Sequence, residues 1–235
     1  MSAFPNVVVR VSRMDGGPHL VIEDSLSLAH VFFTQDASSL GPDAYDTLAG
    51  KGDPVRILTA DIEAINRTMR ARSPHSAWKP ILDTHEPLPW LAVIDPTWDL
   101  LLTEDETWPQ VEDLASAAMV AAVAPYRNLS VMTKVLHLKR PRLFPVLDSL
   151  VVDQIGGQWR SPKELLGHMR QVARDNRSAL TEIRRLLDEA EIARTPARIL
   201  DVLLWSTHPR SSLAPLLPAW EHRFAPVTPA QGMLR

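Results

Sequence analysis

The chain has 235 residues, of which 45% are hydrophobic and 23% charged, and it contains no cysteine. This composition excludes an intrinsically disordered chain and gives enough length for one substantial core or two small lobes. Without cysteine there is no disulfide, no thiolate nucleophile and no cysteine-held metal cluster, which suits a reducing cytoplasm, the expected localisation. No apolar stretch approaches the length of a membrane span, so we expect no membrane partner.

The net charge of −3 hides an uneven distribution of charge. Residues 1 to 125 carry 8 Lys and Arg against 18 Asp and Glu, which is −10, whereas residues 126 to 235 carry 17 against 10, which is +7. Two interpretations stay open. The basic half could face a polyanion, because clustered cations release counterions when they bind phosphates. Alternatively, the two halves pack against each other.

The first predicted element is a β-hairpin in residues 1 to 23, because apolar and polar residues alternate on both sides of Asp15-Gly16-Gly17. Almost everything after it is predicted to be helical. Short apolar segments at residues 26 to 33 and 42 to 48 are followed by a helix that begins near Thr59.

Residues 73 to 109 hold four tryptophans among six prolines: Trp78, Trp90, Trp98 and Trp108. The indole rings could stack on a base or line a ligand pocket. They could also anchor long connections to the core. We favour anchoring, because tryptophan is highly buried on average and proline-rich connections need a contact that holds them.

Helix starts are clearly marked in the second half of the chain. A capping residue precedes an apolar run at Thr107, Asn128, Asp148, Ser161 and Thr195. The tail beyond Pro209 is rich in proline and predicted to be irregular. The expected fold class is therefore mainly α, with a helical domain of residues 24 to 235 that could divide into two lobes.

The candidate site residues lie between Asn128 and Gly157. Lys134 is the only lysine in the body of an apolar helix, where burial would lower its pKa and make the amine nucleophilic. Asp148 follows a proline turn at the start of the next helix, where it can cap that helix. Three cations at the end of the first helix are candidate phosphate contacts: Lys139, Arg140 and Arg142.

Four segments share a pattern with other sequences: AYDTLAG (44 to 50), ILTADIEAIN (57 to 66), TKVLHLKRPRLFPVLDSLV (133 to 151) and RILDVLLWSTH (198 to 208). Together they resemble a bacterial family of uncharacterised proteins, a domain of unknown function. This resemblance covers most of the chain and implies no activity.

A second resemblance is confined to residues 129 to 155. Its matching positions are Thr133, Lys134, Val135, Pro145, Val146 and Asp148. They resemble the part of helix-hairpin-helix DNA glycosylases in which a helix with the catalytic lysine is followed by a Pro-Val-Asp turn. The resemblance implies a DNA glycosylase-like hydrolase of DNA repair, with Lys134 as the nucleophile and Asp148 as the acid. The glycine-rich hairpin of those enzymes has no counterpart in residues 129 to 132, and Leu147 separates Val146 from Asp148.

Other site chemistries find no support in the chain. The histidines do not have the spacing of a zinc enzyme, so no metal is expected. The Gly50-Lys51-Gly52 loop lacks the other residues of a P-loop, and neither a nucleophile elbow nor a dinucleotide fingerprint is present, so no cofactor is expected.

Two functional hypotheses remain open. In the first, the chain binds DNA and excises a base, with Lys134 and Asp148 facing one cleft. In the second, it is a non-catalytic binding or regulatory module in which both residues are structural. The sequence leaves the ligand and the oligomeric state undetermined.

Overall fold

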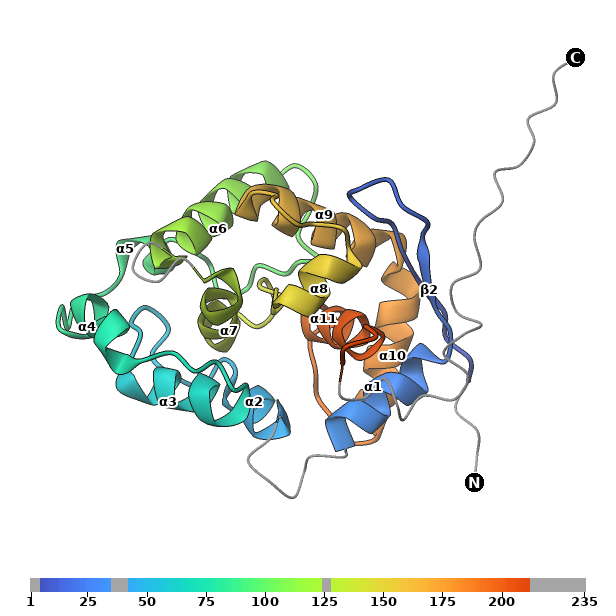
Figure 1. Ribbon diagram of the computed structural model, residues 1–235, viewed down its shortest axis with the longest axis horizontal. Coiled ribbons are helices and arrows are strands. Elements are labelled where there is room, and N and C mark those ends of the chain that lie inside the picture. Colours follow the sequence, from blue (N-terminus) through green and yellow to red (C-terminus); the bar gives the residue numbers. More distant parts are fainter. Residues whose placement is uncertain (1–4, 35–41, 124–127, 212–235) are drawn as a thin grey trace, which may run out of the picture.

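The computed structural model describes residues 5–34, 42–123 and 128–211. Within these residues the chain forms eleven helices and one small antiparallel sheet (Figure 1). The expected fold class, mainly α with an N-terminal β-hairpin, is confirmed. Most of the tail that we predict to be irregular, residues 212–235, lies outside the described residues.

The helices are named in chain order. They are α1 (Ser25–Thr34), α2 (Pro42–Leu48), α3 (Thr59–Thr68), α4 (His75–Leu82), α5 (Pro89–Ala92), α6 (Trp108–Val123), α7 (Leu129–Lys139), α8 (Ser149–Gln154), α9 (Pro162–Asp175), α10 (Arg177–Glu189) and α11 (Pro196–Ser206). Among the described residues, no helix has both the length and the apolarity that a membrane crossing needs.

The hairpin pairs β1 (Val9–Val11) with β2 (Leu20–Ile22), with Val9 opposite Ile22. Its strands are shorter than the alternating pattern predicts. The chain leaves the ladder after Val11 because the tip binds α8 instead: Met14 N–H donates to the Ile155 carbonyl at 2.8 Å. The tip of the hairpin therefore contacts the C-terminal end of α8, the helix that begins at the candidate acid.

Two helices are buried on nearly all sides and organise the rest (Figure 1). α7 packs against α2, α3 and α6, whereas α11 packs against α1, α8, α9 and α10. A helix buried all round belongs in the middle of a core, where its polar side chains must find partners inside the protein. One cluster of buried apolar side chains includes residues from both α7 and α11.

The tryptophans of residues 73 to 109 anchor this segment to the core. Trp78 is 1% exposed and donates to the Ser73 hydroxyl at 2.7 Å. Trp108 is buried beneath the guanidinium of Arg170, and Trp90 and Trp98 are partly buried against the core. The anchoring interpretation is confirmed. The segment is more ordered than a simple connection, however, because α4 and α5 form within it. Pro74 precedes α4 and Pro89 begins α5, and the start of a helix is where proline is best tolerated.

The two oppositely charged halves pack against each other. Among the described residues, seven lysines and arginines of the second half form ion pairs with carboxylates of the first, in the pairs Lys139–Asp61, Arg142–Asp99, Lys163–Asp113, Arg170–Asp105, Arg174–Asp105, Arg194–Asp46 and Arg198–Asp46. These contacts favour internal packing over a polyanion-binding half as the explanation of the charge asymmetry.

Candidate functional site

Lys134 lies in the middle of α7. The helix begins where the Asn128 side chain accepts a hydrogen bond from Val131 N–H at 3.2 Å, as predicted. Lys134 is 8% exposed, and its Nζ lies 3.4 Å from the carbonyl oxygen of Met69, just after α3. Burial lowers the pKa of Lys134, and the negative charge of Asp148 is the strongest influence that opposes this shift.

Asp148 begins α8. Its Oδ1 accepts hydrogen bonds from Leu150 N–H at 2.9 Å and Val151 N–H at 3.0 Å, so the predicted cap is confirmed. The structure also brings the Asp148 carboxylate into electrostatic interaction with the amine of Lys134, although fourteen residues separate them in sequence. The two candidate catalytic residues therefore share one environment.

The turn between them is held by buried side chains. Val146 N–H donates to Asp201 Oδ2 at 2.7 Å, and Leu147 N–H donates to the Thr133 hydroxyl at 3.0 Å. Both acceptors belong to the two central helices, α11 and α7. The turn that leads to Asp148 is thus held by hydrogen bonds to both central helices.

Asp201 belongs to a buried ionic network around Arg198. Arg198 Nε lies 2.7 Å from Asp46 Oδ1, and Arg198 Nη1 lies 2.6 Å from Asp201 Oδ1. Burial raises the pKa of both carboxylates, and the charge of Arg198 opposes that rise. Burial alone would lower the pKa of Arg198, but the two carboxylates outweigh it, so the guanidinium stays charged.

Tyr45 and His137 connect this network to Lys134. The Tyr45 hydroxyl donates to the Lys134 carbonyl at 2.6 Å, and its ring stacks on His137. Burial lowers the pKa of His137 to about 3, so the imidazole is neutral at physiological pH. Its Nδ1 is 2.7 Å from the Phe144 carbonyl, which can only accept, so Nδ1 carries the proton. His137 is thereby committed to an internal contact.

Two of the three predicted phosphate contacts are internal. The Lys139 side chain is 1% exposed and its Nζ lies 2.6 Å from Asp61 Oδ2. Arg140 is 3% exposed and donates to four backbone carbonyls, those of Pro54, Leu91, Ile94 and Lys139. In this conformation neither cation reaches solvent. Arg142 is 44% exposed, with Nε 3.4 Å from Asp99 Oδ2.

A different set of cations lies close in the chain to Met69, the residue that Lys134 contacts. Arg67, Arg70 and Arg72 are exposed, and none of their side chains forms a hydrogen bond or ion pair with another described residue. Arg70 and Arg72 have φ of 48° and 51°, in the left-handed region that bulky side chains seldom adopt. They follow Met69, whose carbonyl accepts from Lys134. Sequence analysis missed them because they lie in the acidic half, more than sixty residues from Lys134.

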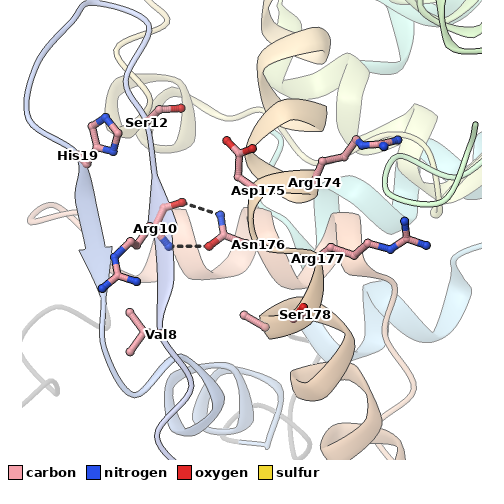
Figure 2. Close-up of a pocket in the computed structure, with 10 residues that line it drawn as sticks. Val8, Arg10, Ser12, His19, Arg174, Asp175, Asn176, Arg177 and Ser178 are labelled. Atoms are coloured by element: carbon pink, nitrogen blue, oxygen red, sulfur yellow. Dashed lines mark hydrogen bonds between the residues drawn. The ribbon is translucent and has the colours of Figure 1, made fainter. Parts of the chain in front are cut away.

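A pocket of about 410 Å³ lies between β1 and the junction of α9 with α10 (Figure 2). There Asn176 accepts from Arg10 N–H at 2.8 Å and donates to the Arg10 carbonyl at 2.6 Å. Figure 2 shows the guanidinium groups of Arg174 and Arg177 on the side of the helices away from β1. The cations of this pocket do not converge on one point, so we regard the Lys134 and Asp148 pair as the stronger candidate site.

Comparison with known proteins identifies one family. The model of a family of unknown function, DUF6308, matches residues 25–208, which include every candidate site residue and leave out the hairpin. No curated protein and no solved structure matches the chain. The resemblance to an uncharacterised family is confirmed, and none of these comparisons shows a likeness to DNA glycosylases.

Replacing Asp148 separates its cap from its charge. Asp148→Ala should lower the free energy of unfolding by about 1 kcal/mol, because two N–H groups lose their acceptor. Asp148→Asn should recover most of that loss, since an amide oxygen can accept the same two bonds. Denaturant midpoints measure both. Equal losses in the two variants would mean that the carboxylate charge matters more than the cap.

Arg140 and Arg142 form a matched pair for testing burial. Arg140→Ala should destabilise the fold by about 3 kcal/mol or more, because four carbonyls lose a charged donor. Arg142→Ala should cost at most about 1 kcal/mol, as expected of an exposed ion pair. Urea unfolding of both variants makes the comparison. Similar, small losses in the two variants would show that the hydrogen bonds of Arg140 to these four carbonyls do not stabilise the fold.

Proposed function

We propose that this chain, which belongs to the DUF6308 family of unknown function, is a DNA-binding protein that acts on DNA through the amine of Lys134. The observation that carries the proposal is the setting of this amine. The amine is mostly buried and its pKa is lowered. The negative charge of Asp148 is the strongest influence that opposes this lowering of the pKa. A lowered pKa makes a lysine amine a better nucleophile for an aldehyde.

The chemistry follows from these two groups. The Lys134 nitrogen forms a bond to the aldehyde carbon of an abasic sugar, and the carbonyl oxygen leaves as water with both amine protons. Protonation of the resulting imine gives an iminium ion, whose positive charge Asp148 stabilises. A glycosylase of this kind first releases a base from the same carbon, and Asp148 would then act as the acid–base group of that step.

DNA phosphates would be bound by exposed cations near the amine. Arg70 and Arg72 meet this requirement, because they are exposed, their side chains have no partner among the described residues, and they closely follow Met69 in the chain. Lys139 and Arg140 do not meet it, because their charges are already used inside the fold. The proposed phosphate contacts are therefore Arg70 and Arg72, with Arg142 as the one retained from the three cations of the sequence prediction.

The alternative is a non-catalytic binding module with the same scaffold. It is favoured by the hydrogen bond between Lys134 Nζ and the Met69 carbonyl, which gives the amine an internal role. Such a module would keep the exposed arginines as a binding surface. It would not need access to the amine.

Borohydride trapping tests the catalytic proposal. Abasic duplex DNA with sodium borohydride should give a covalent adduct with the wild-type chain and none with Lys134→Met, which keeps the aliphatic stem. Because the pKa of Lys134 is lowered, the rate of trapping should rise with pH and level off below the range of an ordinary lysine, whose pKa is about 10.4. The adduct is measured by gel shift and mass spectrometry.

Base release must be assayed in parallel, because a glycosylase can use an acid and water without a lysine adduct. Circular dichroism of Lys134→Met provides the control for folding. An adduct that still forms with a folded Lys134→Met variant would show that another residue is the nucleophile. Absence of both adduct and base release with the wild-type chain would leave the binding module as the function.

The phosphate contacts are tested by a pair of double variants. Arg70→Ala/Arg72→Ala should weaken duplex binding and reduce the slope of log K against log salt by about 2, one unit for each lost phosphate contact. Arg10→Ala/Arg177→Ala removes two exposed arginines at the Figure 2 pocket and should leave the slope unchanged. The opposite result would place the DNA contact at the pocket.

A further inference from the structure

Trp159 is the most exposed large apolar side chain among the described residues. It is 103% exposed, which means that no part of the indole is covered by the protein. The ring makes no hydrogen bond and no ring contact with the described residues, in contrast to Trp78 and Trp108. Trp90 and Trp98 are also partly buried against the core, so Trp159 differs from all four tryptophans of residues 73 to 109.

The backbone at Trp159 is also unfavourable. Arg160 N–H donates to the Gly157 carbonyl at 3.2 Å and closes a four-residue turn between α8 and α9. Trp159 occupies the third position of this turn with φ of 67°, where a glycine is normally found because a side chain is strained there. Trp159 therefore combines backbone strain with an exposed indole, and no contact of the ring with the described part of the chain offsets them.

The turn holds the backbone of Trp159 in a fixed place. Gly157 N–H donates to the Val152 carbonyl at 2.9 Å, and a Cβ added to Gly157 would lie 2.5 Å from Leu165 Cδ2, so the turn sits directly on α9. Arg160 donates to the Met14 carbonyl of the hairpin tip at 3.4 Å. Because the backbone of this turn is already anchored, binding of a partner by the ring need not order the backbone as well.

The surroundings of the ring indicate the kind of partner. Its neighbours in the turn, Gln158 and Arg160, are polar, so they do not extend the indole into an apolar patch of the kind that binds another protein surface. A single aromatic ring with two open faces suits a planar group, and every nucleobase offers one. Arg160 and Arg13 at this corner are paired with Glu164 and Asp15, so the indole itself, and not net charge, is what this corner offers a partner.

We infer that Trp159 is a stacking platform for an unpaired nucleobase of single-stranded nucleic acid. This inference rests on the proposed DNA-binding function and adds a second contact to it. α8 has six residues, about 9 Å, and separates the cap Asp148 from the turn that carries Trp159. One strand could then contact both the Lys134 site and the indole.

Binding of short single-stranded oligonucleotides tests the inference. The wild-type chain should bind a normal oligonucleotide more tightly than an abasic one with the same phosphates, whose sugars are reduced so that they offer Lys134 no aldehyde. Trp159→Ala should weaken binding of the normal oligonucleotide about tenfold and leave the abasic one unchanged, and Trp159→Phe should keep most of the affinity. Equal affinity of wild type and Trp159→Ala for the normal oligonucleotide would overturn the inference while leaving DNA binding intact. Failure of wild type to bind any DNA would overturn the proposed function as well.

A stability measurement separates a binding role from a structural one. Trp159→Gly should raise the denaturation midpoint, because glycine relieves the strain, while base binding falls as in Trp159→Ala. Glu191→Gly is the matched control, since Glu191 is exposed with φ of 61°, and it should raise the midpoint without changing binding. A lower midpoint in Trp159→Gly, or self-association of the wild-type chain that Trp159→Ala abolishes, would assign the ring to an internal or protein contact and overturn the inference.

Discussion

The buried guanidinium of Arg198 is the interaction on which the arrangement of the candidate site depends. It lies between Asp46 of α2 and Asp201 of α11, and Asp201 in turn accepts the backbone N–H of Val146. A charge buried this deeply must keep its partners, because leaving one of them unpaired costs several kcal/mol. The positions of α2, α11 and the turn before Asp148 are therefore linked.

Such a network is a poor source of stability. Removing charges from water costs about as much as their attraction returns, and apolar residues of similar volume often serve as well or better. Here one oxygen of Asp46 and one nitrogen of Arg198 also have no hydrogen-bond partner among the described residues. The geometric effect is clearer than the energetic one, because the network, with Tyr45 bonded to the Lys134 carbonyl, holds the backbone on both sides of the candidate pair. Three of the four segments that carry the family resemblance supply these residues.

Burial explains why the same residue types have different roles in this chain. Arg140 and Arg142 are two residues apart, yet one binds four carbonyls inside the core and the other lies half-exposed at the surface. The guanidinium of Arg140 meets carbonyls at the end of α5, where the dipole of a helix favours a cation. A cluster of basic residues in the sequence is thus divided between structure and surface by the way α7 packs.

The sequence by itself determined the features that depend on neighbouring residues. The caps at Asn128, Asp148 and Ser161, the hairpin and the mainly helical fold all follow from local hydrogen bonding and apolar periodicity, and all are present. The tertiary structure alone decided which charges are free. The contacts of Lys139 with Asp61 and of Lys134 with Met69 join residues more than sixty positions apart. No local pattern encodes such contacts, because they depend on how α3 and α7 meet across the core.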